Sequence, residues 1–182
     1  MPTAAEYVTR ISALDWDGLA DLWQAILQND TSGWDSGKAF EYLILRSFHL
    51  DGAEVSWPYS VRLFSLEVEQ IDGAVHCDGL SALVESKDYA ENVSIAPIAK
   101  LRNQLLRRPA GTIGLMFSRS DFTDPARFLT QFTLPQAILL WKGEEVEYAL
   151  QRQRIRDLLT LKYRICVEQG LSDYDVREGN IP

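Results

Sequence analysis

Three charged residues near the ends of two short extended segments have the types and spacing of a divalent-metal site. Asp72 ends the first segment, and Glu85-Ser86-Lys87 ends the second. Between them lies Asp78-Gly79, flanked by apolar residues, which is a strong signal for a tight hairpin turn. If the segments pair, two carboxylates and one ammonium converge at one end of the hairpin. Carboxylate oxygens suit hard ions such as Mg²⁺, and the lysine could orient or activate the attacking water and stabilise charge on a phosphate.

A fourth acidic residue, Glu41, lies in the apolar pattern of a helix predicted over residues 38–49. Its ordinary role is that of a solvent-facing helix former. The alternative is that Glu41 projects toward the strand ends and helps to hold a metal, which the downstream Asp72 and Glu85-x-Lys87 favour. Both interpretations remain open from the sequence.

Length and composition indicate an ordinary globular protein that forms a single domain over residues 1–182. The chain is 46% hydrophobic and 24% charged, and it has no apolar run of the roughly twenty residues that a membrane span needs. The N-terminus lacks the features of a signal peptide, so we expect a cytoplasmic protein. Cys77 and Cys166 are far apart and match no metal or redox spacing, which predicts reduced structural thiols.

The net charge of −8 argues against a protein that coats nucleic acid, because such binding depends on many Lys and Arg contacts with phosphate. A local basic cleft remains compatible with that charge. Basic residues cluster at 100–108 and again at 152–164. Such clusters on a helix more often form a solvated face than a DNA-binding groove.

The remaining pattern predicts alternating helices and strands. Apolar periodicity predicts a helix over 11–28, capped by Ser12 or Asp15, and the helix over 38–49. Extended structure is expected at 54–57, and one or two short strands at 60–71. After the hairpin follow a helix from Pro97, a buried strand at 112–117, a short helix from Asp124, a buried strand at 137–141, one long helix from 144 to 168 that Gly170 ends, and a loose tail over 171–182.

The succession of strand, helix and strand after the hairpin implies a crossover connection and parallel pairing. We therefore expect an α/β fold with a mixed sheet flanked by helices on both faces, an N-terminal helix pair and a long C-terminal helix over 143–169. The sequence contains no phosphate-binding loop, no dinucleotide fingerprint and no serine-centred nucleophile elbow.

The order of these features resembles the PD-(D/E)xK nuclease superfamily, and within it the Mrr-type restriction endonuclease catalytic domains. The resemblance covers roughly residues 37–150. It begins with a helix glutamate, a strand aspartate and Glu-x-Lys, and continues with the buried strand at 111–117, Phe122-Thr123 and Ala126, and Ile138-Leu139-Leu140-Trp141 before Gly143. The chain departs from the family pattern at Gly73, where some members carry an acidic residue, and at Ile71, where the superfamily's name has proline.

The resemblance implies a restriction-endonuclease-like fold and a role for each residue of the motif. Asp72 and Glu85 would bind the metal together with the backbone carbonyl of Ser86, Lys87 would position the attacking water, and Glu41 would be an outer or second-metal ligand. The implied ion is Mg²⁺, for which Mn²⁺ can substitute. The implied reaction is endonucleolytic hydrolysis of DNA phosphodiester bonds by a metal-activated water, in prokaryotic restriction, defence or repair.

Three further residues are candidate substrate contacts. Lys100 and Gln104 lie on the helix that follows the Glu-x-Lys segment, and Arg119 follows the next buried strand. Solvated polar positions are the ordinary interpretation of such helix residues.

Two alternatives compete with a nuclease. Lys87 could form a structural salt bridge with Glu85 or Asp72 at the sheet edge. The chain could also be a catalytically inactive nuclease-like fold that acts as an interaction or assembly module through the arginines of its C-terminal helix, Arg152, Arg154 and Arg156. Expected partners are DNA, a second copy of the chain that docks through this helix and, because no separate DNA-reading domain is evident, a targeting protein; no membrane partner is expected.

Overall fold

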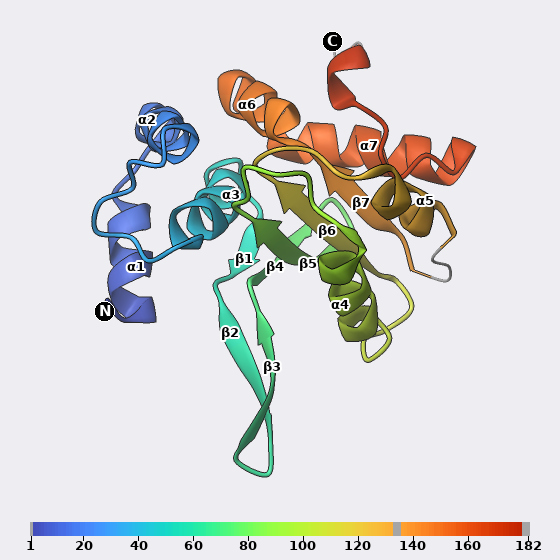
Figure 1. Cartoon of the computed structure of the whole chain (residues 1–182), viewed down its shortest axis with the longest axis horizontal. Coiled ribbons are helices and arrows are strands. Elements are labelled where there is room, and N and C mark those ends of the chain that lie inside the picture. Colours follow the sequence, from blue (N-terminus) through green and yellow to red (C-terminus); the bar gives the residue numbers. More distant parts are fainter. Residues whose placement is uncertain (1, 133–135, 180–182) are drawn as a thin grey trace.

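The computed structural model describes residues 2–132 and 136–179. In chain order the elements are α1 (Ala4–Ser12), α2 (Trp16–Leu27), α3 (Lys38–Leu50), β1 (Glu54–Ser56), β2 (Tyr59–Leu63), β3 (Leu66–Ile71), β4 (Gly73–Cys77), β5 (Leu80–Lys87), α4 (Ile95–Leu105), β6 (Thr112–Ser118), α5 (Asp124–Phe132), β7 (Ile138–Trp141), α6 (Gly143–Arg152), α7 (Ile155–Gln169) and a short 3₁₀ helix (Val176–Glu178) (Figure 1). None of the helices in these ranges is long and apolar enough to cross a membrane.

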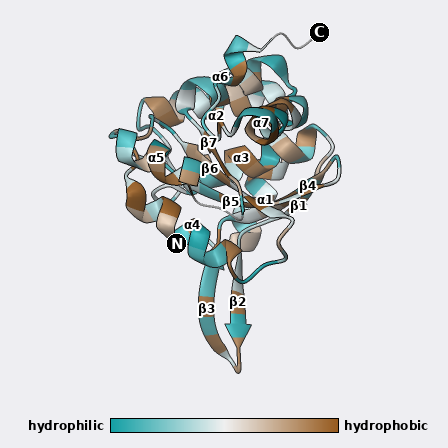
Figure 2. Ribbon diagram, turned by 90° about the vertical axis from the view of Figure 1, so that its right-hand side faces the viewer, coloured by the Kyte–Doolittle hydropathy of each residue, from teal (hydrophilic) through white to brown (hydrophobic). Residues whose placement is uncertain are grey.

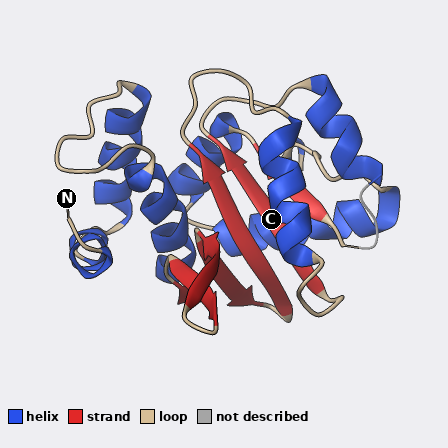
Figure 3. Ribbon diagram, turned by 60° about the horizontal axis from the view of Figure 1, so that its bottom comes forward, coloured by secondary structure: helices blue, strands red, loops and turns tan. Residues whose placement is uncertain are grey.

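A mixed five-stranded sheet forms the centre of the molecule, in the order β1-β4-β5-β6-β7 (Figure 3). β4 pairs with β1 and β5 in antiparallel fashion, while β5, β6 and β7 are parallel. The predicted hairpin is present: Asp78 and Gly79 have φ values of 51° and 79°, as a two-residue turn with two left-handed positions requires. The predicted crossover and parallel pairing are also confirmed.

Helices cover both faces of the sheet, as the alternating pattern predicts. One face packs against α3, α6 and α7, with α1 and α2 packed outside them, through a large core in which Phe48, Phe117 and Trp141 are fully buried. The other face packs against α4 and α5 through a smaller core that includes Leu101 and Met116. The chain therefore has the α/β architecture that the sequence indicates, a mixed sheet with helices on both faces.

The N-terminal region contains three helices, so the prediction of a helix pair is wrong. The helix expected over 11–28 begins only at Trp16, where the Asp15 side chain accepts a hydrogen bond from the Gly18 N–H at 3.0 Å. Ile11 belongs to the separate helix α1, which a capping box of Thr3 and Glu6 begins. The N-caps Thr3 and Asp15 begin two separate helices, and the second cap lies within what looks like one amphipathic pattern.

The expected long helix over 143–169 is two helices, because Gln153 adopts a left-handed conformation (φ 56°) and ends α6. The N-terminus of α7 is then fixed by Asp51, whose carboxylate accepts from the Arg156 N–H at 2.8 Å. A carboxylate in this position complements the positive end of the helix dipole. The interaction with α3 therefore sets the direction of α7 independently of α6.

The prediction of a loose tail over 171–182 is wrong for residues 171–179; residues 180–182 lie outside the described part. Ser172 and Val176 are buried, and the Ser172 carbonyl accepts from the Leu140 N–H at 3.0 Å. The fully buried Lys162 donates to the Tyr174 carbonyl at 2.6 Å and to Glu145 at 2.5 Å. A buried ammonium requires such acceptors, so the tail completes the core.

The hairpin of β2 and β3 projects from the body of the protein (Figure 1), and its tip is hydrophobic (Figure 2). Phe64, in the turn, is 98% exposed. The base of the hairpin is anchored to the end of α4: Arg107 and Arg108 pair with Glu69, and the Gln104 side chain donates to the Gln70 carbonyl at 3.0 Å. These contacts hold the hairpin at the edge of the main sheet, next to Asp72.

Candidate active site

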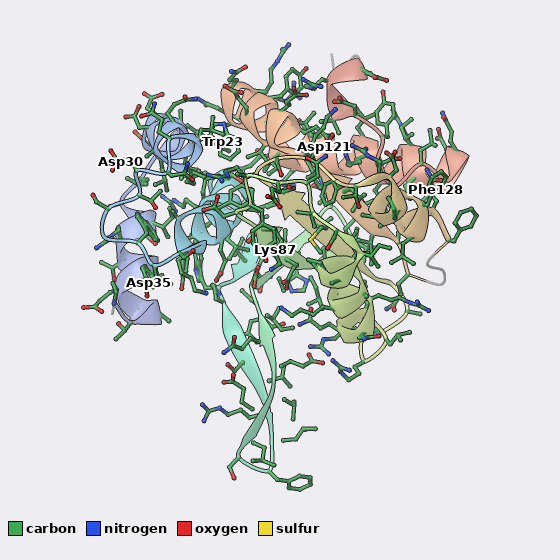
Figure 4. All side chains as sticks on the ribbon, viewed as in Figure 1. Trp23, Asp30, Asp35, Lys87, Asp121 and Phe128 are labelled. Atoms are coloured by element: carbon green, nitrogen blue, oxygen red, sulfur yellow. The ribbon has the colours of Figure 1, made fainter. Side chains whose placement is uncertain are left out.

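The candidate active site lies where four elements meet. Asp72 occupies the bend between β3 and β4, and Glu85 and Lys87 lie two residues apart near the end of β5, so that their side chains share one face of the strand. Glu41 projects from the first turn of α3. Figure 4 shows Lys87 near the centre of the molecule, between α3 and α4.

Glu85 is fully buried and accepts hydrogen bonds from two lysines. The Lys87 Nζ lies 2.6 Å from its Oε1, and the Lys100 Nζ, from α4, lies 2.9 Å from Oε1 and 3.0 Å from Oε2. Lys87 also donates to the Ser86 carbonyl at 3.1 Å. Burial by itself lowers the pKa of Lys87, but the adjacent Glu85 carboxylate outweighs this and raises the pKa above its ordinary value.

Asp72 is held by the backbone of the opposite strand. Its Oδ2 accepts from the Ser86 N–H at 2.8 Å and from the Ser86 hydroxyl at 3.2 Å. Burial raises the pKa of Asp72, and the negative charge of Glu85 raises it further. The bend at the end of β3 thus directs this carboxylate toward the end of β5.

Glu41 is 6% exposed, and both of its carboxylate oxygens accept from the Lys38 Nζ, at 2.9 and 2.7 Å. Burial raises the pKa of Glu41 to about 7, with a further contribution from the negative charge of Asp72, although Lys38 opposes the rise. A carboxyl that is difficult to ionise therefore lies beside two other carboxylates. Clustered groups of this kind with perturbed pKa values are typical of functional sites.

Gly73 allows α3 to approach the sheet closely enough to bring Glu41 to this site. A Cβ atom at Gly73 would lie only 2.4 Å from Cδ2 of Leu45, and Leu45 follows Glu41 by one helical turn on the same face. The glycine at this position therefore has a packing reason in this chain, since any side chain here would require the Leu45 side chain to move.

Two adjoining hollows give the carboxylates access to solvent. The first, of about 230 Å³, is lined by Glu41, Asp72 and Lys87 together with Ser36, Gly37, Lys38, Ser86, Asp88 and Tyr89. The second, of about 340 Å³, shares Lys38, Glu41 and Asp72 with the first and extends along the base of the β2–β3 hairpin. A phosphate group could approach the acidic residues through this opening.

A comparison with models of protein families identifies the family of this chain. The model of the Mrr catalytic domain, described as "Restriction endonuclease", matches residues 35–150, which is more than half of the chain. The chain belongs to the Mrr-type restriction endonuclease family. The match includes all four residues of the sequence motif and the elements that position them, from α3 to α6.

Two solved structures resemble this Mrr-type domain in their fold to different degrees, and only the first, AF1548, reaches a TM-score of 0.50. A crystal structure of a protein of unknown function, AF1548, superposes with a TM-score of 0.50 at 17% sequence identity, covering 72% of this chain and 77% of that protein. The MspJI restriction endonuclease, in complex with a 27-mer oligonucleotide, superposes with a TM-score of 0.45 at 17% identity, covering 96% of this chain and 39% of MspJI. Among curated proteins, none matched the sequence.

The oxygen donors of this Mrr-type domain fit a hard divalent cation in type. Asp72, Glu85 and the Ser86 carbonyl are oxygen ligands of the kind that Mg²⁺ prefers, and Glu41 adds a third carboxylate. In residues 2–132 and 136–179, however, no three acidic, His or Cys side chains are gathered closely enough to hold an ion. Lysine ammonium groups bind Glu41 and Glu85 instead.

The structure gives the three expected substrate contacts other roles. Lys100 pairs with Glu85 and therefore belongs to the site itself. Gln104 is buried and anchors the β2–β3 hairpin, while Arg119 pairs with Asp88 at 3.0 Å and donates to the Ile26 carbonyl at 2.8 Å. Both of these side chains connect elements of the fold.

Lys38 is the site residue that the sequence interpretation missed. Lys38 precedes Glu41 by three residues, a spacing at which side chains on a helix are neighbours. A lysine at position 38 of the predicted helix was therefore a sequence signal for an ion pair with Glu41. The pairing of Lys100 with Glu85 had no comparable signal, because it depends on how α4 packs against the sheet.

Proposed function

We propose that this domain is a metal-dependent endonuclease that hydrolyses phosphodiester bonds of DNA. The observation that carries the proposal is the convergence of Glu41, Asp72 and Lys87 at a solvent-accessible hollow, with the buried Glu85 paired to Lys87 behind it, in a chain of the restriction endonuclease family. Salt bridges with lysines account for Glu41 and Glu85 but not for Asp72, which within the described residues accepts from the Ser86 N–H and hydroxyl and forms no ion pair within 4 Å. A partly buried carboxylate without a cation is costly unless it binds something.

Asp72, Glu85 and the Ser86 carbonyl are the groups that would hold the ion, with Glu41 as a further ligand. When bound, Mg²⁺ or Mn²⁺ neutralises negative charge that develops on the phosphate and lowers the pKa of a water molecule. Lys87 already donates to both Glu85 and the Ser86 carbonyl. The Lys87 ammonium therefore lies beside the Glu85 and Ser86 oxygens that would bind the ion. In that position it orients the attacking water and stabilises negative charge on the phosphate.

A cleavage assay tests this function. Plasmid, linear duplex and single-stranded DNA are incubated with the protein in Mg²⁺ or Mn²⁺, and in excess chelator. We expect cleavage that chelator abolishes and that Asp72→Asn, Glu85→Gln and Lys87→Ala each reduce by at least about a hundredfold, as for loss of a transition-state interaction. The exposed Glu168→Gln is the matched control and should retain activity. Cleavage that persists in all three site variants would refute the assignment.

The second candidate function is an inactive nuclease-like module that binds another protein or a second copy of the chain. The observation that favours it is the apolar tip of the β2–β3 hairpin, where Leu63, Phe64 and Leu66 are exposed. The arginine surface expected from the sequence is a weaker candidate, because Arg156 pairs with Asp78 and Arg152 lies over the Tyr148 ring. Light scattering of the wild-type protein and Phe64→Ser tests this alternative: an oligomer that the substitution dissociates would support it.

A further inference from the structure

Two lysines at the rim of the candidate site bind carboxylates that belong to its ligand set. Lys38 donates to both oxygens of Glu41 at 2.9 and 2.7 Å, and Lys100 donates to both oxygens of Glu85 at 2.9 and 3.0 Å. The two carboxylates are buried, whereas the lysine side chains are 39% and 49% exposed. Each lysine therefore approaches its carboxylate from the solvent side.

Lys87 differs from these two lysines in burial and attachment. It is 19% exposed, is part of strand β5 and contacts the Ser86 carbonyl in addition to Glu85. Lys38 and Lys100 instead lie on the separate helices α3 and α4, and their side chains are long, flexible and half in solvent. The rim lysines can leave their carboxylates by side-chain rotation alone, without movement of the sheet.

The rim lysines hold positive charge at the carboxylate oxygens where a metal ion would bind. Both oxygens of Glu41 and both oxygens of Glu85 accept hydrogen bonds, and Oε1 of Glu85 accepts from two ammonium groups. The site thus places three carboxylates beside three ammonium groups: Glu41, Asp72 and Glu85 beside Lys38, Lys87 and Lys100. A divalent cation bound directly to Glu41 or Glu85 would lie a few ångströms from the corresponding lysine ammonium, and the repulsion between the two positive charges favours displacement of the lysine.

We propose that Lys38 and Lys100 are tethered counter-ions: they neutralise Glu41 and Glu85 in the metal-free protein, and a divalent cation displaces them when it binds. This inference rests on the proposed function, since it assumes a metal ion at this site. Displacement leaves the Lys38 ammonium at the opening of the site, where Lys38 lines the two hollows and a DNA phosphate would approach. Metal binding and phosphate binding are then linked through Lys38.

Calorimetric titration with MnCl₂, without DNA, tests the competition directly. Lys100→Met and Lys38→Met should each bind Mn²⁺ about threefold to tenfold more tightly than the wild-type protein, because the ion no longer has to break an ion pair. Arg102→Met is the matched control: it removes a positive charge from the exposed face of the same helix, α4, and should change the affinity by less than about twofold through screened long-range electrostatics. Unchanged or weaker binding in both lysine variants would overturn the proposal.

Thermal unfolding gives a second measurement that does not depend on activity. In excess chelator, Lys100→Met should melt at a lower temperature than Arg102→Met, because buried Glu85 loses a partner; Mn²⁺ should remove most of that difference. A difference that persists in saturating Mn²⁺ would show that Lys100 is structural and would overturn the proposal for it. If neither the wild-type protein nor any variant binds Mn²⁺, the proposed metal-dependent function fails as well, whereas equal binding by all of them overturns only the counter-ion role.

Discussion

Replacing Glu41 by glutamine should stabilise the metal-free protein above neutral pH and abolish its cleavage activity. Glu41 is buried and its pKa is raised to about 7 by burial and by the negative charge of Asp72. The folded protein therefore holds the proton of Glu41 more tightly than the unfolded chain does. Stability is lost as pH rises from the unfolded pKa through the folded one, and glutamine, which carries no charge, removes that loss.

The size of the effect follows from the two pKa values. A pKa that moves from 4.5 in the unfolded chain to about 7 in the folded protein corresponds to roughly 3 kcal/mol, at about 1.4 kcal/mol for each pH unit. The contribution of Lys38 is already included in that pKa. Between about pH 5 and about pH 8, the stability of Glu41→Gln should therefore rise by roughly 2–3 kcal/mol relative to that of the wild-type protein.

Urea unfolding in chelator at the two pH values measures this difference. Glu168→Gln, which removes an exposed carboxylate from α7, is the control and should follow the wild-type protein at both pH values. If wild-type protein and Glu41→Gln respond to pH in parallel, Glu41 is not held as a buried carboxyl of high pKa, and the reasoning is refuted. A variant that is more stable yet inactive would identify Glu41 as a functional group that is retained at the expense of stability.

Three further outcomes test the fold around the site. Lys162→Met should lower the free energy of unfolding by about 3–5 kcal/mol, because it leaves the Glu145 carboxylate buried without its cation. The double variant Lys162→Met with Glu145→Leu should recover much of that loss. Urea unfolding of the wild-type protein, the single variant and the double variant measures both changes. Asp175→Asn should lower stability at neutral pH by about 1–2 kcal/mol. Burial alone raises the pKa of Asp175, but its bonds to Arg177 and Lys142 hold the pKa below its ordinary value. The stability that the Asp175 carboxylate contributes is therefore lost as pH falls below about 4. In a pH series of unfolding measurements, Asp175→Asn should lack that acid-dependent loss. Phe64→Ser should leave the melting temperature of the monomer within about 2 °C of wild type, since this side chain is 98% exposed; a larger decrease would show that the hairpin tip packs against something.

The local pattern of the sequence determined much of the site. Asp78-Gly79 favours left-handed backbone at both positions, so the hairpin that joins β4 to β5 could be predicted from two residues. The period of two along a strand places Glu85 and Lys87 on one face. The succession of apolar strands and helices then specified parallel pairing and a sheet with helices on both faces.

Breaks within helices were not visible in the apolar periodicity. The single amphipathic patterns at 11–28 and 144–168 continue across the interruptions between α1 and α2 and between α6 and α7. Asp15 does give a local signal for the first break, as a cap. Gln153 gives none for the second, since this left-handed position carries neither glycine nor asparagine, and the direction of α7 depends on the contact of its N-terminus with Asp51.

Only the tertiary structure decided which charges neutralise one another at the site. Glu41 lines the same two hollows as Asp72 because Leu45 packs against the bare backbone of Gly73, and Lys100 contacts Glu85 because α4 lies across the sheet. Sequence spacing encodes contacts within one helix or one strand, as for Lys38 and Glu41. Contacts between elements depend on close packing of side chains far apart in the chain, and for this reason the counter-ion Lys100 emerged only from the folded protein.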